Sequence, residues 1–198
     1  MELTDTEQQF MEKAFEYAYE ALAAKEVPVG CIFVYKDEIV ALGRNTVNES
    51  RNATRHAEIN CIEQVTDYCR DKGLDLGAAF RQVCVYVTVE PCIMCINALY
   101  DLGVHSRGGT GSNYSLQSIR YTMRPELPSI EVENVVFGCK NDRFGGQTVF
   151  DVGSVRQAPT RIKGGWRAEE AMNLLKEFYK GVNPSAPPSK VKVRGKKT

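Results

Sequence analysis

The sequence predicts an α/β fold in which a single sheet is covered by helices on both faces. Segments with the periodicity of a helix alternate with short apolar runs, in the order helix, strand, strand, helix, strand, helix, strand, helix. The run Val83–Val89 is rich in β-branched residues and almost wholly apolar, which is typical of a strand buried on both faces. Because helices separate the later strands, we expect parallel strands in the second half of the sheet.

The first half of the chain contains a predicted helix, a hairpin and a second helix. Thr4 and Glu7 form a capping-box pattern ahead of apolar residues at helical spacing, which marks the start of the first helix. Lys36-Asp37-Glu38 separates two apolar runs and indicates the turn of the hairpin. The predicted elements are a helix over residues 5–25, strands over residues 29–35 and 39–42, and a helix from about residues 53–56 to Arg70.

The second half continues with strands and helices around two irregular segments. Pro91 suits the first turn of a helix and follows Val83–Val89 closely. Residues 73–77 are interpreted as a loop or a broken helix, and residues 103–128 as an irregular excursion rich in Gly, Ser, Asn and Pro. The remaining predicted elements are a helix over residues 91–102, a strand over residues 131–139 and a helix over residues 168–180.

Length and charge indicate one domain with a short tail. The 25 Lys and Arg residues balance the 25 Asp and Glu residues, which excludes a protein that binds nucleic acid through overall basicity. We expect a domain over residues 1–188 and a basic tail over residues 189–198, which could add RNA affinity, direct nuclear import or have no function. No apolar run approaches the ~18 to 20 residues of a membrane span, and residues 1–7 do not resemble a signal peptide. We therefore expect an intracellular protein, cytoplasmic or nuclear, with no membrane association.

Two of the seven cysteines are spaced for metal chemistry. Without a secretory signal, the cysteines are expected to be thiols or metal ligands, and five of them lie singly among apolar residues. Cys92 and Cys95 are three residues apart, so they share a helical face and can bind one ion through both sulfurs. His56 and Glu58 lie at the entrance of another predicted helix, where an irregular first turn would let their side chains converge.

These residue types predict a catalytic zinc site. His56, Cys92 and Cys95 would supply three ligands and leave the fourth tetrahedral position for water. Zinc lowers the pKa of such a water to about 7, which makes hydroxide available at neutral pH. Glu58 is a poor ligand for a site with two thiolates, and we expect it to carry a proton from the water to a ring nitrogen and then to the leaving amine.

Each motif alone also has a simpler interpretation. Cys92 and Cys95 alone would fit a redox pair or half of a structural zinc site, and His56 alone would fit an ordinary surface or core histidine. His56-Ala57-Glu58 followed by Pro91-Cys92-Ile93-Met94-Cys95, both at helix entrances, is the signature of the zinc nucleobase deaminases. Together the two motifs favour a deaminase.

At these residues the chain resembles the cytidine deaminase-like superfamily, and further segments resemble the tRNA adenosine deaminases within it. The resemblance covers about residues 7–102 and 132–188. Arg143-Phe144-Gly145-Gly146 and Arg167-Ala168-Glu169-Glu170 are most similar to the catalytic subunit of the eukaryotic wobble-position enzyme. The other matching segments are Glu26-Val27-Pro28-Val29-Gly30-Cys31, Gly43-Arg44-Asn45, Asn52-Ala53-Thr54-Arg55-His56-Ala57-Glu58, Tyr86-Val87-Thr88-Val89-Glu90-Pro91-Cys92-Ile93-Met94-Cys95, Phe137-Gly138-Cys139 and Phe178-Tyr179.

The resemblance implies a cytidine deaminase-like three-layer α/β/α fold with a central mixed sheet. It also implies hydrolytic deamination of adenosine to inosine at the wobble position of tRNA anticodons, with Zn²⁺ as cofactor. The implied partners are tRNA and a related subunit that lacks the catalytic glutamate, and since Glu58 is present, this chain resembles the active half. By the same resemblance, Asn45 would hydrogen-bond the flipped base, Val29 would wall the pocket and the backbone of Ala57 would help read the ring edge.

Two segments have more than one interpretation. Phe144 could stack on a base and Arg143 could meet a phosphate, as aromatic and basic side chains do in single-strand binding sites. A glycine turn with one packed phenylalanine explains the same residues equally well. Relative to the family pattern, the chain also has an insertion at about residues 103–132, beside the expected dimer face and active-site rim.

Two other functions are compatible with a zinc site. A deaminase of free nucleotides or bases, such as deoxycytidylate, cytosine or guanine, would use the same chemistry, although the basic tail and Arg143-Phe144 argue against it. A non-catalytic, zinc-containing RNA-binding subunit would have no use for Glu58.

Overall fold

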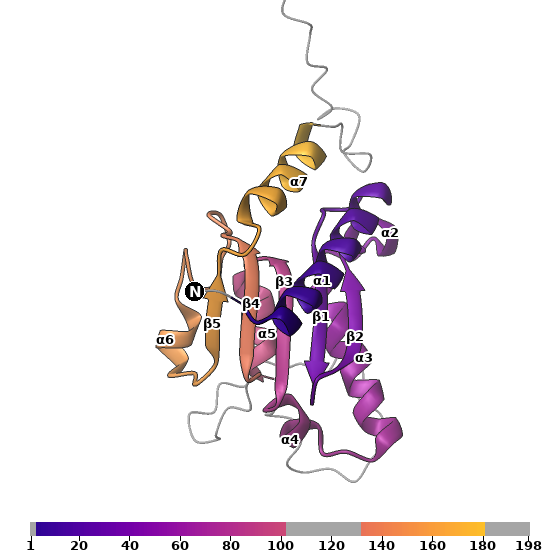
Figure 1. The fold of residues 1–198 in the computed structure, drawn as a ribbon, viewed down its shortest axis with the longest axis vertical. Coiled ribbons are helices and arrows are strands. Elements are labelled where there is room, and N and C mark those ends of the chain that lie inside the picture. The colour runs from indigo at the N-terminus through magenta and orange to yellow at the C-terminus, as the bar shows by residue number, and fades with distance from the viewer. Residues whose placement is uncertain (1–2, 102–131, 181–198) are drawn as a thin grey trace, which may run out of the picture.

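A computed structural model describes residues 3–101 and 132–180 of the chain. A five-stranded sheet lies between two layers of helices (Figure 1). The elements are α1 (Asp5–Ala23), β1 (Gly30–Tyr35), β2 (Glu38–Arg44), α2 (Val47–Ser50), α3 (Ala57–Lys72), α4 (Leu76–Phe80), β3 (Val83–Val89), α5 (Ile93–Asp101), β4 (Asn134–Cys139), α6 (Val152–Arg156), β5 (Arg161–Gly164) and α7 (Ala168–Lys180).

The sheet is mixed, with the strand order β2-β1-β3-β4-β5. Strand β1 pairs antiparallel with β2 and β3, whereas β3, β4 and β5 run parallel to one another. Helices α1 and α7 lie on one face of the sheet, and α3 and α5 lie on the other (Figure 1). The predicted three-layer α/β/α fold, its mixed sheet and the parallel strands of its second half are confirmed.

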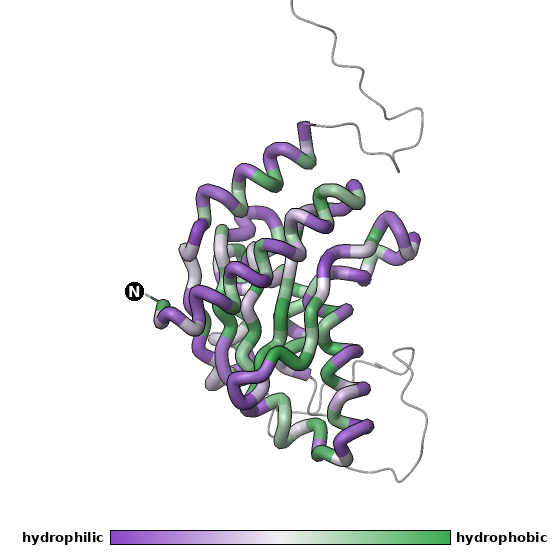
Figure 2. The backbone as a smooth tube through the Cα atoms, turned by 45° about the vertical axis from the view of Figure 1, so that its right-hand side comes forward, coloured by the Kyte–Doolittle hydropathy of each residue, from purple (hydrophilic) through white to green (hydrophobic). Residues whose placement is uncertain are grey.

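The core occupies both faces of the central strands. Every residue of β3 is buried except the half-buried Cys84, as predicted from the apolar run. Figure 2 shows these strands as the hydrophobic centre of the molecule, with hydrophilic residues gathered on the surrounding helices. From α1, the side chains of Met11, Phe15 and Ala18 are buried towards the sheet. Full burial of a large apolar side chain stabilises a fold by about 1.5–3 kcal/mol.

Helix α1 begins as the capping-box pattern predicts. The backbone N–H of Glu7 donates to Thr4 Oγ1 at 3.2 Å, and the backbone N–H of Thr4 donates to Glu7 Oε2 at 2.9 Å. The helix ends at Ala23, slightly before the predicted end, because Lys25 adopts a left-handed backbone conformation with φ 59°.

Four short elements were absent from the predicted order: α2, α4, α6 and β5. The helices among them have four or five residues, which is too short to display a helical period. Residues 73–77 contain Gly73, which ends α3 with φ 64°, and then the first turn of α4. Strand β5 has no buried residue, so its sequence carries no apolar signal.

Helix α5 begins at Ile93, and the prediction that Pro91 opens this helix is wrong. The carbonyl oxygen of Pro91 accepts a hydrogen bond from the N–H of Gly146 at 3.0 Å, and Cys92 forms a β-bridge with Gly145. These contacts with a distant loop hold Pro91 and Cys92 outside the helix.

The predicted insertion at residues 103–132 lies outside the described residues except for Val132, which is buried. The basic tail at residues 189–198 also lies outside them. Across residues 3–101 and 132–180, none of the helices has the length and apolar character needed to cross a membrane.

Candidate metal centre and active site

The predicted site residues lie at one edge of the sheet. The pairing directions place the carboxyl ends of β2, β3 and β4 at the same edge as the start of β1. Asn45 follows β2, Cys92 follows β3, Arg143 follows β4 and Val29 precedes β1. Ligand sites in α/β sheets usually form outside the carboxyl ends of the strands.

Three potential metal ligands meet there, at the entrances of α3 and α5. The ligand atoms of His56, Cys92 and Cys95 all lie within 4.8 Å of one another. His56 Nδ1 is 3.6 Å from the sulfur of Cys92 and 3.4 Å from that of Cys95. Among the residues that the structure describes, this is the one group of three or more His, Cys, Asp or Glu residues close enough to hold an ion.

Zinc fits this donor set. With Zn–N bonds of about 2.05 Å and Zn–S bonds of about 2.3 Å, a tetrahedral ion would separate the nitrogen from each sulfur by about 3.6 Å. The observed separations of 3.6 and 3.4 Å are close to this value. One imidazole with two thiolates is also a ligand set that catalytic zinc sites use, because it leaves one position for water.

The three ligands interact strongly with one another. A hydrogen bond from Cys95 lowers the pKa of Cys92 to about 4; burial opposes this shift and His56 adds to it. The same contact with Cys92, together with burial, raises the pKa of Cys95 well above its usual value, and a hydrogen bond with Cys92 raises the pKa of His56. Metal ligands must be deprotonated, so binding of a cation would compete with the protons on these groups.

Glu58 faces the same cluster from the first turn of α3. His56 is the N-cap of this helix and has an extended backbone, with φ −74° and ψ 159°, so it does not follow the helical rotation. The irregular turn predicted from the sequence is thus confirmed. Glu58 is 3% exposed, and burial, followed by the charge of Cys92, raises its pKa to about 7. Such a carboxyl group can accept and release a proton near neutral pH.

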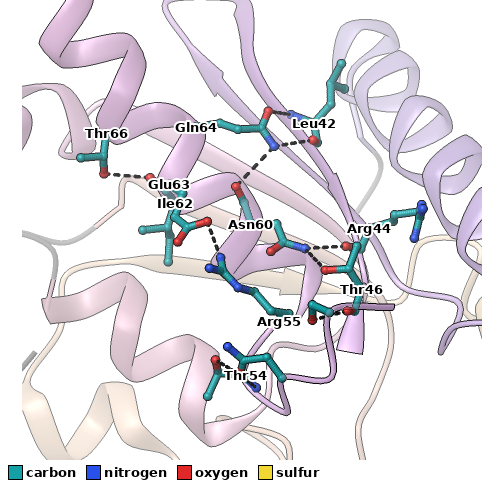
Figure 3. Close-up of polar contacts among 12 residues, drawn as sticks. Leu42, Arg44, Thr46, Thr54, Arg55, Asn60, Ile62, Glu63, Gln64 and Thr66 are labelled. Atoms are coloured by element: carbon teal, nitrogen blue, oxygen red, sulfur yellow. Dashed lines mark hydrogen bonds and ion pairs between the residues drawn. The ribbon is translucent and has the colours of Figure 1, made fainter. Parts of the chain in front are cut away.

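Polar contacts with the edge strand β2 fix the position of α3 (Figure 3). Gln64 Nε2 donates to the carbonyl oxygen of Leu42 at 2.7 Å, and the N–H of Leu42 donates to Gln64 Oε1 at 3.2 Å. Asn60 Nδ2 donates to the carbonyl oxygen of Arg44 at 2.9 Å. These side chains satisfy backbone groups that an edge strand leaves unpaired. The N-terminus of α3, which carries Glu58, is thereby held against the end of β2.

The three residues assigned to the base pocket by resemblance contact one another. Asn45 is 4% exposed, and its Oδ1 accepts a hydrogen bond from the N–H of Ala57 at 3.0 Å. The N–H of Asn45 donates to the carbonyl oxygen of Val29 at 3.2 Å. The N–H of Ala57 is therefore already engaged, which the sequence did not indicate.

Arg143 and Phe144 lie in the loop that follows β4. Both are exposed, and the Phe144 side chain is 64% exposed. The alternative of a packed phenylalanine is therefore wrong. The backbone of Phe144 is fixed, because its carbonyl oxygen accepts a hydrogen bond from the N–H of Ile93 at 2.8 Å.

One buried residue of this region was missed in the sequence. Glu90 follows β3, is 2% exposed, and accepts hydrogen bonds from residues of the loop after β4. Burial alone would raise the pKa of Glu90, but the hydrogen bonds from Thr148, Asn141 and Gln147 outweigh it and lower the pKa. The available signal was an acidic residue at the end of an otherwise apolar run.

Known proteins are similar to this chain in sequence and in fold. Residues 4–107 match the model of the cytidine and deoxycytidylate deaminase zinc-binding region. The tRNA-specific adenosine deaminase 2 of Danio rerio is 45% identical over 93% of this chain and 76% of its own length. The tRNA-specific adenosine deaminase subunit tad2 of Schizosaccharomyces pombe is 33% identical over 90% of this chain, which spans 38% of that protein.

A solved structure supports the same relationship at the level of the fold. It comes from work on A-to-I editing by tRNA:A34 deaminases at the wobble position of transfer RNA. Its TM-score is 0.60 at 23% identity, and the match covers 85% of this chain and 99% of that chain. The chain therefore belongs to the cytidine and deoxycytidylate deaminase family, within the group that contains the tRNA-specific adenosine deaminases.

Proposed function

We propose that this chain is the catalytic subunit of a zinc-dependent tRNA adenosine deaminase that converts adenosine to inosine at the wobble position of the anticodon. The reaction consumes one water and releases one ammonia. The observation that carries the proposal is the buried carboxyl group of Glu58 beside His56, Cys92 and Cys95, in a chain so similar to the zebrafish deaminase.

Each residue of the cluster has a distinct task. His56, Cys92 and Cys95 hold the zinc ion, which when bound supplies Lewis-acid activation of a water molecule. Glu58 accepts a proton from the water and delivers it to N1 of the adenine ring. It then takes the second proton of the water from the new hydroxyl group on C6 and delivers it to the amine that leaves from C6 as ammonia, so that the glutamate ends the cycle in its starting state.

The base pocket is formed by Asn45, Val29 and Ala57. The Oδ1 of Asn45 is held by Ala57, so the amide nitrogen of Asn45 is the group oriented to donate a hydrogen bond to the flipped base. Val29 supplies an apolar wall. Direct reading of the ring edge by the N–H of Ala57 would require its bond to Asn45 to open.

Two residues of the loop after β4, Arg143 and Phe144, contact the anticodon strand. Phe144 offers an exposed ring on which a neighbouring base stacks, and Arg143 pairs with a phosphate. An adenosine in an anticodon loop is unpaired, so moving it into the pocket costs at most a few kcal/mol.

A related subunit that lacks the catalytic glutamate completes the enzyme. The fission-yeast relative is itself named a subunit, and Glu58 marks this chain as the active half. We assign residues 1–188 to the deaminase domain and residues 189–198 to a basic tail. The enzyme acts inside the cell, in the cytoplasm or nucleus.

The test compares substrates and one variant pair in the complex with the partner subunit. Wild-type complex should form inosine at the wobble position of tRNA and leave free deoxycytidylate, cytosine and guanine unchanged. Glu58→Ala should abolish turnover with zinc content unchanged, whereas Glu12→Ala, on the exposed face of α1, should have no effect. Turnover of free nucleotides or bases alone would establish the first alternative, and full tRNA activity of Glu58→Ala would establish a non-catalytic role.

A further inference from the structure

Glu90 lies in the chain between the end of β3 and the metal ligand Cys92. Its backbone N–H donates to the carbonyl oxygen of Cys139 at 2.8 Å, which extends the pairing of β3 with β4 by one residue. Cys92 follows two residues later. A segment bound by the Glu90 side chain is therefore fixed relative to the residues from Cys92 to Cys95, here named the metal-binding turn.

The Glu90 carboxylate closes residues 141–148 into a ring, here named the 141–148 loop. Oε1 accepts from the N–H groups of Gln147 at 2.9 Å and Thr148 at 2.7 Å. Oε2 accepts from the N–H of Asn141 at 3.0 Å and from Thr148 Oγ1 at 2.6 Å. A carboxylate has about four lone-pair sites, and all are used. Both ends of the loop thus bind one side chain.

Glu90 has no ion-pair partner within the described residues. A buried charge without a counter-ion is costly unless hydrogen bonds replace its hydration. Here loop donors make that replacement, three of them backbone N–H groups. The carboxylate is therefore satisfied only while the loop keeps this conformation.

The glycines of the loop permit this close approach. A Cβ on Gly145 would lie 2.4 Å from Glu90 Oε1 and 2.6 Å from the carbonyl oxygen of Asn141. A Cβ on Gly146 would lie 2.4 Å from Ile96 Cγ2 in α5. All three contacts are shorter than van der Waals separations, so only glycine fits at these positions.

The tip of the loop is exposed. Gly145 and Gly146 are buried, whereas Arg143 and Phe144 are exposed. Phe144 is joined to the metal-binding turn through its carbonyl oxygen, which accepts from the N–H of Ile93, the residue after Cys92. The Arg143-Phe144 tip is thus fixed from the inside and open to solvent on the outside.

We propose that Glu90 is a positioning residue that holds the Arg143-Phe144 tip at a fixed place relative to the metal centre, so that tRNA bound at the tip presents its adenosine to the pocket. This rests on the proposed function, because it assigns the tip to RNA. Glu90 acts through the 141–148 loop and touches neither metal nor substrate. Its loss lowers tRNA affinity and leaves the chemistry of bound tRNA intact.

The test uses Glu90→Gln in the complex with the partner subunit. The amide replaces one oxygen by an NH₂ group, which would face N–H donors and release one end of the loop. KM for tRNA should rise about tenfold, within the range for one base-stacking contact. We expect kcat within about twofold of wild type, an unchanged zinc content, and faster hydrogen exchange at the N–H groups of Asn141, Gln147 and Thr148.

Milder variants guard against a failure of Glu90→Gln to fold. Thr148→Val removes one hydrogen bond to the carboxylate, and should raise KM and loop exchange in the same direction by a smaller factor. Thr148→Ser keeps the hydroxyl and should match wild type. Gln147→Ala keeps the backbone donor and should also match wild type, because Glu90 binds Gln147 through its N–H alone.

A double-mutant cycle with Phe144→Ala separates this inference from the proposed function. If Phe144→Ala raises KM and Glu90→Gln adds nothing to it, the two act through the same contact, as proposed. If Phe144→Ala raises KM and Glu90→Gln and Thr148→Val do not, the inference is wrong and the RNA contact stands. If Phe144→Ala and Arg143→Ala both leave KM unchanged, the RNA contact of the tip is wrong, and the inference with it.

A different result would also overturn the inference. If Glu90→Gln and Thr148→Val lose both zinc and kcat, Glu90 supports the metal site instead of the loop tip.

Discussion

The metal cluster and the 141–148 loop lie side by side at the same edge of the sheet, yet they are held in place by different means. In the cluster, His56, Cys92 and Cys95 converge through their side chains, and the residue types themselves indicate the chemistry. In the loop, backbone N–H groups converge on the single carboxylate of Glu90. Backbone donors are the same in every sequence, so no residue type of the loop identifies what it binds.

The two regions have different roles in the proposed function: the cluster determines the reaction, and the loop contributes to recognition of the substrate. A zinc ion with a nearby glutamate can deaminate many nucleobases, so the cluster determines the reaction class. Recognition of an RNA strand requires groups outside the cluster, at a fixed distance from it. The structure provides that fixed distance through hydrogen bonds that join the loop to Glu90, Pro91 and Ile93, all within two residues of Cys92.

The largest expected effect comes from breaking the cluster. Cys95→Ser should weaken zinc binding by about 100-fold or more, which removes about 2.7 kcal/mol of linked stability, because the ion ties the entrances of α3 and α5 together. Zinc content and melting temperature should fall together. Cys84→Ser, at a cysteine outside the cluster, is the control and should keep its zinc. Equal melting temperatures of wild-type protein with and without a chelator would contradict this role of the metal.

A second prediction separates the two functions of Asn45. Asn45→Ala leaves the buried N–H of Ala57 without an acceptor and should cost about 1–3 kcal/mol of stability, in addition to weakening substrate binding. Asn45→Asp keeps an oxygen for Ala57, replaces the amide nitrogen by a second oxygen and places a carboxyl group at a buried position, which also lowers stability. Its KM for tRNA should be raised under conditions in which chemical denaturation shows that the variant is folded. A normal KM for Asn45→Asp would remove the amide nitrogen from base recognition.

A third prediction concerns the loop. Gly145→Ala places a methyl group against the Glu90 carboxylate and should raise KM for tRNA by roughly tenfold, comparable to losing one stacked base. The zinc content should stay the same, since His56, Cys92 and Cys95 are untouched. Gln147→Ala changes a neighbouring side chain without this clash and serves as the control. A Gly145→Ala enzyme with normal KM would show that the loop tolerates displacement.

The smallest effect is expected from a substitution outside both regions, at Gln64 in α3. Gln64→Ala removes the side chain that pairs with both backbone groups of Leu42 on the edge strand. The free energy of unfolding should fall by about 1 kcal/mol, the usual net contribution of such hydrogen bonds, with little change in kcat. Denaturant titration measures the first quantity and a tRNA assay the second. A large drop in kcat would mean that the docking of α3 on β2 controls Glu58.

The sequence predicted features that depend on local pattern. Thr4 and Glu7 contact one another within one helical turn, and Val83–Val89 forms a strand whose burial is evident from its residue types. The metal cluster combines two such local motifs, and their order along the chain was enough to predict that they form one site. The sequence also predicted that His56 and Glu58 converge at an irregular helix entrance, and in the structure His56 is the extended N-cap residue just before α3.

The features that were missed depend on contacts between distant segments. Pro91 is kept out of α5 by Gly146, which lies more than fifty residues further along the chain. Strand β5 exists because it pairs with β4, although none of its residues is buried. The role of Glu90 likewise depends on donors from the 141–148 loop. Spacing and periodicity describe neighbours in sequence, so they could not indicate these long-range contacts.

The central claim is that one zinc ion is held by His56, Cys92 and Cys95 with a fourth position left for water. X-ray absorption at the zinc edge of the purified chain tests it most directly. We predict one zinc per chain with two sulfur ligands at about 2.3 Å and the remaining ligands nitrogen or oxygen. The zinc that Cys95→Ser still binds at excess zinc should have one sulfur ligand fewer, and the spectrum of Glu58→Ala should match that of the wild type. A chain without zinc, or a zinc ion whose spectrum changes in Glu58→Ala because the glutamate is a ligand, would contradict the account.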